Sequence, residues 1–147
     1  MKLITDTKTL SKVSKEIKDD AVKLHYSWLR STIVDRNGKL QGCSAIQYGQ
    51  PVRAFAMRDP RTKEFYFMFN PEVKWKLGVR PSVEGCLSVE GRYLVTRPLF
   101  IKATWKDENL EKHTKVFGPK RSRIFMHEMD HLNGKTIKSE GIGGFKC

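Results

Sequence analysis

Apolar side chains recur at steps of three and four positions near the start of the chain. This spacing matches one face of an α-helix and predicts an amphipathic helix over residues 9–30. The residues expected to face the core are Leu10, Val13, Ile17, Ala21, Leu24 and Trp28. From residue 52 onward the pattern changes to short apolar or β-branched runs, which are typical of strands.

The predicted strands and turns describe a series of antiparallel hairpins. The strand runs cover residues 52–57, 64–70, 73–77, 93–95, 100–105 and 112–117, with turn signals at residues 59–60, 70–71, 78 and 107–109. A second helix is predicted over residues 120–132, because Gly118-Pro119 precedes it and Asn133-Gly134 is a common helix end. The sequence therefore predicts an α+β fold in a single domain over residues 1–147.

The chain is basic, with 28 Lys and Arg against 16 Asp and Glu, which gives a formal net charge of +12. The basic residues are scattered, so the charge favours polyanions such as RNA without naming a function. Three cysteines, Cys43, Cys86 and Cys147, do not form a disulfide framework. No signal-peptide pattern or apolar run of membrane-spanning length occurs, and we expect a soluble, cytoplasmic monomer without membrane contact.

The second predicted helix contains His-Glu-Met-Asp-His at residues 127–131, the HExxH pattern. Two histidines four positions apart lie on one face of a helix, so both imidazoles can reach one metal ion. Glu128 would then lie close enough to exchange a proton with a metal-bound water without being a ligand. Asp130 is expected to point away from this face and receives no catalytic role. The other two histidines, His25 and His113, are expected at the surface.

A catalytic metal site needs a third protein ligand and an open position for water. A third histidine six positions after His131 would extend the helix motif, but Ile137 stands there. Glu140 stays open as an alternative, although it is poorly placed near the end of the sequence. The thiol of Cys86 is the stronger candidate, because thiolates bind borderline metals well. We therefore predict a mononuclear site formed by Cys86, His127 and His131.

Two segments resemble signature motifs of the peptide deformylase family. Residues 84–88, Glu-Gly-Cys-Leu-Ser, and residues 127–131 match two of the family's three motifs without change. The third motif, GxGxAAxQ, falls on residues 40–47. The agreeing positions there are Gly42, Ala45 and Gln47, and the departures are Leu40 and Ser44. The resemblance covers residues 9–137 and indicates a short form that stops at Cys147, without the C-terminal extension of many bacterial relatives.

This resemblance implies a hydrolase that removes the N-formyl group from N-formylmethionyl nascent peptides and releases formate. It implies one divalent metal ion per chain, usually Fe²⁺ in the family, while the ligand set also suits Zn²⁺, Ni²⁺ and Co²⁺. The family ligands carry over to Cys86, His127 and His131, and the catalytic carboxylate to Glu128. Metal-bound hydroxide would attack the formyl carbon, while Glu128 takes the proton and returns it to the leaving amine.

Further roles around the metal follow from the same resemblance. The amide of Gln47 and the backbone N–H of Leu87 would stabilise the oxyanion that develops on the formyl oxygen. An ion pair between Glu84 and Arg97 would steady the Cys86 loop. Substrate contacts are expected at Gly42, Gly85, Arg92 and Ile124.

Three departures from the family pattern bear on the substrate. Residues 40–44, where the family binds the peptide backbone as an added strand, carry more bulk here and could reshape the groove. The loop after Ser88 is shorter than usual. Arg123, four positions before His127, is expected near the apolar pocket for the methionine side chain, where it either turns away or changes specificity.

Two rival functions remain open. A zinc peptidase that cuts internal amide bonds would act on unformylated peptides and would not depend on Cys86. A basic RNA-binding module with a vestigial metal site would keep its affinity in a Glu128→Ala variant. The net charge also leaves weak ribosome association, through contacts with RNA phosphates, as a hypothesis.

Overall fold

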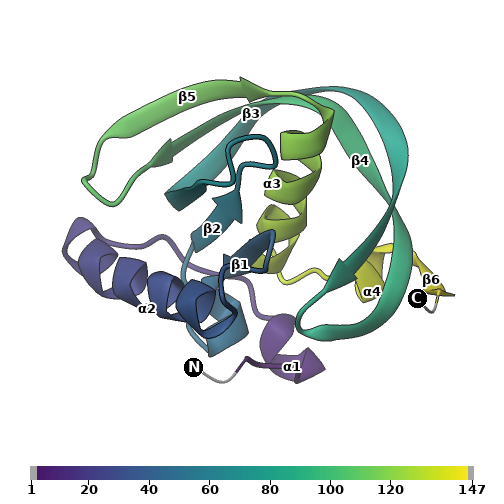
Figure 1. Cartoon of the computed structure of the whole chain (residues 1–147), viewed down its shortest axis with the longest axis horizontal. Coiled ribbons are helices and arrows are strands. Elements are labelled where there is room, and N and C mark those ends of the chain that lie inside the picture. The colour runs from purple at the N-terminus through teal and green to yellow at the C-terminus, as the bar shows by residue number, and fades with distance from the viewer. Residues whose placement is uncertain (1–2, 146–147) are drawn as a thin grey trace.

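The computed structural model describes residues 3–145, in which one antiparallel sheet curves around helix α3 (Figure 1). Five strands pair in chain order: β1 (Gly42–Ser44), β2 (Ala54–Arg58), β3 (Phe65–Cys86), β4 (Val89–Lys106) and β5 (Lys112–Phe117). A sixth, β6 (Ile142–Phe145), pairs with β4. The helical elements are α1 (Thr7–Leu10), η1 (Asp19–Ala21), α2 (Val22–Asp35), η2 (Ala45–Tyr48), α3 (Pro119–Leu132) and α4 (Ile137–Glu140). The α+β class with an antiparallel sheet is confirmed. Cys147 lies outside the described residues.

Strand β3 is longer than the sequence pattern predicted, because two of the expected turns lie within it and do not interrupt it. Asn70 adopts a φ of 49°, and the register between β3 and β4 shifts between Phe69 and Glu72, so Pro71 lies in a bulge. Gly78, with a φ of +72°, allows close packing, since a Cβ there would lie 2.8 Å from Cδ1 of Leu99. The predicted breaks at residues 70–71 and 78 were wrong, and the strand runs on either side are continuous.

The predicted helix over residues 9–30 is correct for residues 22–30, which belong to α2, but wrong before them, because the chain between α1 and η1 is extended. Its backbone bonds to distant segments instead of to itself: the N–H of Ser14 donates to the carbonyl of Leu132 (2.9 Å), and the N–H of Lys15 to that of Pro51 (2.9 Å). The backbone of Ile17 makes two hydrogen bonds with the Asn70 side chain, at 2.7 and 2.8 Å. Val13 is consequently 66% exposed instead of core-facing.

The core has two layers that share strand β2. Phe55 and Met57 pack against α3, whereas Ala54 and Ala56 pack on the side of α2. This alternation follows from the two-residue period of a strand. Helix α2 buries Leu29 and also His25, so the expected surface position of His25 was wrong; its Nδ1 lies 3.3 Å from the hydroxyl of Tyr48.

Helix α3 contains residues 127–131 and packs one face into the core. Phe125, Met129 and Leu132 are buried in the core cluster. The helix ends at Leu132 with Asn133 as its C-cap, and Gly134 takes a left-handed φ of +74°, where a Cβ would collide with the carbonyl of Ser11. In the described part of the chain, every helix is too short or too polar to cross a membrane.

Candidate active site

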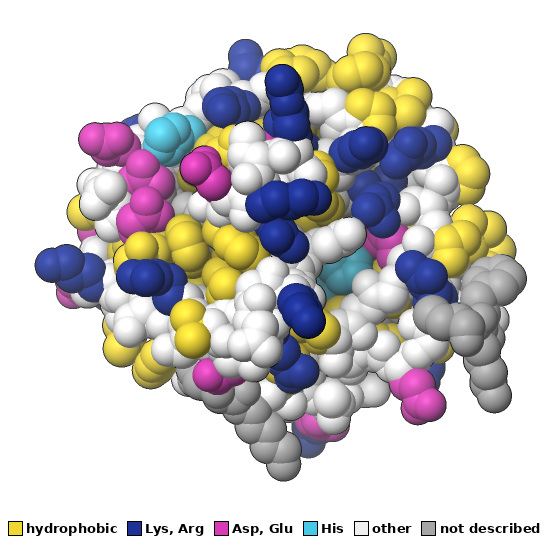
Figure 2. Space-filling view, in the orientation of Figure 1, with side chains coloured by type: hydrophobic (Ala, Val, Ile, Leu, Met, Phe, Trp, Pro, Cys, Tyr) yellow, Lys and Arg dark blue, Asp and Glu magenta, His cyan; other side chains and the backbone are white. Residues whose placement is uncertain are grey.

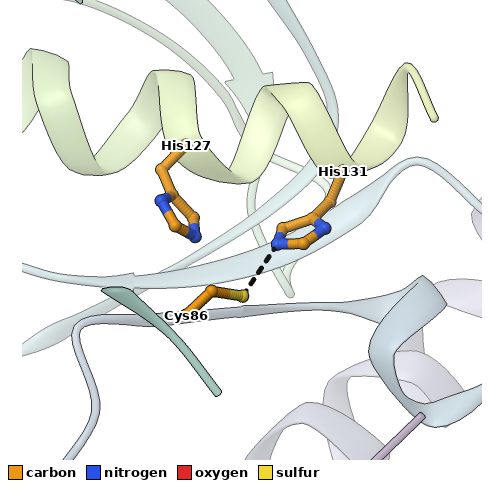
Figure 3. A group of neighbouring side chains, drawn as sticks. All are labelled: Cys86, His127 and His131. Carbon is orange, nitrogen blue, oxygen red and sulfur yellow. Dashed lines mark hydrogen bonds between the residues drawn. The ribbon is translucent and has the colours of Figure 1, made fainter. Parts of the chain in front are cut away.

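Three side chains that can bind a metal meet between α3 and the two-residue turn that joins β3 to β4 (Figure 3). His127 and His131 project from one face of α3 toward Cys86, the last residue of β3. Their ligand atoms all lie within 4.8 Å of one another, and Sγ of Cys86 is 3.4 Å from Nε2 of His131. Sulfur and nitrogen ligands of a tetrahedral ion lie about 3.6 Å apart, so the donor set fits one metal ion.

A second layer of charged groups holds these side chains in place. Oε1 of Glu84 lies 2.8 Å from Nδ1 of His127, which leaves Nε2 of that imidazole for coordination. Arg97 donates two hydrogen bonds to the Glu84 carboxylate, at 3.0 and 2.8 Å, and a third to Oδ2 of Asp130 at 2.6 Å. The expected pair of Glu84 and Arg97 is present and buried, with both side chains 4% exposed. Asp130, given no role from the sequence, ties Arg97 back to α3.

The surroundings of the ionisable groups in this cluster shift their pKa values in different directions. Burial disfavours the charge of Glu84, but hydrogen bonds with His127 and Arg97 outweigh it and lower the pKa of the carboxyl to about 2. Burial also disfavours charge on His127, yet contacts with Cys86 and Glu84 raise its pKa to about 10. Burial lowers the pKa of His131 to about 3. A bound metal ion would displace the proton on Nε2 of His127, because a ligand nitrogen must be unprotonated.

Glu128 lies beside this cluster and is only 2% exposed. Burial raises the pKa of its carboxyl above the ordinary range, against the opposing effects of His127 and of a hydrogen bond from Ser44. A Cβ on Gly42 would lie 2.8 Å from Oε2 of Glu128, so a side chain at that position would crowd the carboxylate. A raised pKa is what a carboxyl group needs in order to take up and return a proton during a reaction.

A cavity of about 380 Å³ opens in front of Glu128 and the ligand cluster. Its walls include the expected residues Gly42, Gln47, Glu84, Gly85, Cys86, Leu87, Arg92, Ile124, His127 and Glu128, together with Lys39, Leu40, Gln41 and Arg123. Arg97 and His131 are not among the lining residues. Leu40 borders the cavity, but its side chain is 5% exposed and packs with Leu3 and Cys43 in the core. The extra bulk at Leu40 is therefore accommodated mainly by the core.

Comparison with known proteins places this chain in a family. The family model described as polypeptide deformylase matches residues 2–140. The chain belongs to the peptide deformylase family. It is 33% identical to a peptide deformylase of Synechocystis sp. over 121 residues, which are 79% of this chain and 64% of the relative. It is 34% identical to one of Chlorobaculum parvum over 99 residues, which are 63% of this chain and 53% of the relative.

The matched regions thus span about half to two thirds of the length of these curated relatives of the family. The solved structure of a probable peptide deformylase from Synechococcus phage S-SSM7 has a TM-score of 0.84 with this chain at 25% identity. That match covers 95% of this chain and 99% of the phage chain. The deformylase fold is therefore present over nearly the whole described length.

Two serines of this family member take part in the site, although sequence reasoning gave neither of them a role. Ser44 donates through Oγ to Oε1 of Glu128 (2.9 Å), and its N–H donates to Oε1 of Gln47 (2.9 Å). Nε2 of Gln47 donates to Oγ of Ser88 (2.9 Å) and lies 3.8 Å from Sγ of Cys86. A local signal existed, since Ser44 and Gln47 form an S-x-x-Q capping box. The other partners, Glu128 for Ser44 and Ser88 for Gln47, are distant in the sequence, so no local pattern indicated these contacts.

Proposed function

We propose that this chain is a metal-dependent peptide deformylase, which hydrolyses the N-formyl group of N-formylmethionyl peptides and releases formate. One observation carries the proposal: a buried carboxylate, Glu128, lies beside a Cys/His₂ cluster at the base of a cavity of about 380 Å³. Three protein ligands leave one coordination position for water, as in catalytic sites of this kind.

Cys86, His127 and His131 would hold one divalent ion, and Fe²⁺ is the metal we expect. The 3.4 Å spacing between Sγ of Cys86 and Nε2 of His131 supports this assignment, as does the orientation of His127 by Glu84. A bound ion would lower the pKa of water and polarise the formyl oxygen. The ligand types suit Zn²⁺, Ni²⁺ and Co²⁺ as well, so the native metal is a matter for measurement.

Glu128 would move the proton during the reaction. Its carboxylate accepts a proton from the attacking water and delivers it to the peptide nitrogen as the C–N bond breaks, which yields formate and a free amino terminus. The hydrogen bond from Ser44 fixes Oε1, so Oε2 is the oxygen available to the substrate. Its raised pKa supports a role in which the group is alternately charged and neutral.

Gln47 and the N–H of Leu87 would stabilise negative charge on the formyl oxygen. The N–H of Ser44 fixes the carbonyl end of the Gln47 amide, which directs the NH₂ group toward Ser88 and Cys86. Leu87 follows Cys86 in the tight turn and lines the cavity. Donors fixed before the reaction stabilise developing charge without reorganisation.

The peptide backbone would lie along β1. This strand is at the end of the sheet order β1-β2-β3-β4-β5, and Gly42 within it lines the cavity. An edge strand can pair with an extended peptide through its free backbone groups. The proposed substrate thus has its formyl group at the metal and its chain along β1. Monomeric state, cytoplasmic location and weak ribosome association remain predictions.

The decisive experiment follows the products of formyl-Met-Ala-Ser with protein loaded anaerobically with Fe²⁺ or Ni²⁺. A deformylase releases formate and intact Met-Ala-Ser, which an enzymatic formate assay and mass spectrometry detect together. Cleavage of unformylated peptides at an internal bond would support the zinc-peptidase alternative. Metal-loaded protein that binds RNA but releases no formate would support the RNA-binding alternative and reject this proposal.

A further inference from the structure

Three cationic side chains line the proposed substrate cavity, and each comes from a different segment of the chain. Lys39 belongs to the segment before β1, Arg92 to β4 after the Cys86 turn, and Arg123 to α3. Among the described residues, none of the three has a carboxylate partner within ion-pair distance. Figure 2 shows several Lys and Arg side chains around a hollow in which a histidine and an acidic side chain are visible.

The acidic groups of the cavity do not neutralise these cations. Only two acidic residues are among the lining residues, Glu84 and Glu128, and they are 4% and 2% exposed. Glu84 is already bound by Arg97 and His127. Glu90 lies two positions before Arg92 but does not line the cavity. The charge that a ligand meets at the mouth is therefore positive.

Two of the cations lie close to the reacting groups. Arg123 is one helical turn before His127 on the same face of α3. Nε of Arg92 is 3.9 Å from the position that a Cβ on Gly85 would occupy, directly beside Cys86. If the first residue of a peptide lies at the metal centre, the residues that follow it lie beside Arg92 and Arg123.

We propose that the cavity selects formylated peptides that carry Asp or Glu directly after the methionine. The inference rests on the proposed deformylase function and adds a substrate class to it. Peptide carboxylates fit better than RNA phosphates, because the cations line an open cavity beside the proposed catalytic groups. Partly exposed ion pairs contribute little singly, so three cations together give a preference of about tenfold.

The test compares kcat/KM for formyl-Met-Asp-Ser, formyl-Met-Asn-Ser and formyl-Met-Lys-Ser at low ionic strength. The expected order is Asp, then Asn, then Lys, with about tenfold between Asp and Asn, and a smaller ratio at about 0.5 M salt. Arg92→Gln and Arg123→Gln should each lower the ratio of Asp to Asn. Lys112→Gln, the same charge change in β5 away from the cavity, should leave it unchanged.

A binding measurement makes this test independent of turnover. Calorimetry with the products Met-Asp-Ser and Met-Asn-Ser should show the same preference, and the Arg92→Gln and Arg123→Gln variants should lose it. Equal kcat/KM values and equal affinities for the Asp and Asn peptides would overturn the proposal. Equal peptide values together with tight binding of a single-stranded RNA of about ten nucleotides would assign the cations to RNA instead. Absence of formate from every peptide would reject the proposed function separately.

Discussion

Two groups of side chains in the described chain place three possible metal ligands within 4.8 Å of one another. They are Cys86, His127 and His131 between α3 and the β3–β4 turn, and Asp107, Glu111 and His113 around the β4–β5 hairpin. The first group joins a strand end to a helix and lies beside a cavity. The second group is confined to one hairpin on a more acidic part of the surface (Figure 2).

The two groups differ in the hydrogen bonds that their polar atoms make. Oδ1 of Asp107 accepts the backbone N–H groups of Asn109 (2.8 Å) and Glu111 (3.0 Å), while Oδ2 lies 2.6 Å from Nε2 of His113. The His113 ring stacks on Trp105, a contact that the expected surface position of this histidine did not include. In the first group, Glu84 accepts a hydrogen bond from Nδ1 of His127 and is itself held by Arg97, which leaves the ligand atoms facing one another. Close spacing of metal-binding side chains therefore indicates a metal site less well than the hydrogen bonds that orient those side chains.

The largest expected effect comes from the metal ligands themselves. Cys86→Ser should reduce metal affinity by more than about 100-fold, since even supporting residues around a metal contribute about 10–100-fold. His113→Gln should leave one ion per chain. Metal content after gel filtration, measured by mass spectrometry, compares the two variants. Loss of the ion in His113→Gln, or its retention in Cys86→Ser, would reverse the assignment of the two groups.

The buried ion pair that supports the first group should contribute to the free energy of unfolding. Glu84→Gln removes the charge of a buried pair and should cost about 3 kcal/mol of unfolding free energy, because Arg97 loses a desolvated partner. Glu72→Gln is a matched control, since its pair with Lys74 is 50–59% exposed and should change stability by less than about 1 kcal/mol. Urea denaturation gives both values, and equal losses in the two variants would show that the buried pair has no special role.

Ser44 offers a finer test, because it reaches Glu128 without reaching the ligands. Ser44→Ala removes the hydrogen bond to Oε1 of Glu128, and a hydrogen bond to a charged group is worth about 1.5–3 kcal/mol. We expect kcat for formyl-Met-Ala-Ser to fall about tenfold, with metal content unchanged. Steady-state kinetics would contradict this role if KM alone changed.

The smallest effect belongs to the hairpin group and depends on pH. Burial disfavours the charge of Asp107, but hydrogen bonds with His113 and the backbone outweigh it and lower the pKa of the carboxyl. A lowered pKa in the folded state adds stability above the ordinary value of about 3.9, and this stability is lost as the pH falls below it. Asp107→Asn should cost about 1 kcal/mol at pH 7. Its deficit should shrink in acid, and a deficit that grew there would contradict the assignment.

The features that sequence reasoning found were those with local patterns. The spacing of His127 and His131 follows from one helix, and the motif around Cys86 was recognisable by family resemblance. The roles of Ser44, Ser88 and Asp130 depend on partners that only tertiary structure brings near.

The errors in the predicted fold have the same cause. Apolar spacing in residues 9–30 suggested one helix, but hydrogen bonds with Leu132, Pro51 and Asn70 favour an extended chain before α2. Tertiary partners also keep β3 continuous through Pro71 and Gly78, which are strong turn signals on their own. The motifs therefore predicted which side chains lie together better than local propensity predicted the ends of the elements.

The central claim is that Glu128 performs hydrolysis at a metal held by Cys86, His127 and His131. Formate release per bound metal ion, compared between the parent chain and Glu128→Gln, tests it most directly. We predict one ion per chain in both proteins and a rate in Glu128→Gln that is at least about 100-fold lower, since general acid–base catalysis contributes about 10²–10⁴-fold. Equal rates per bound ion would contradict the account.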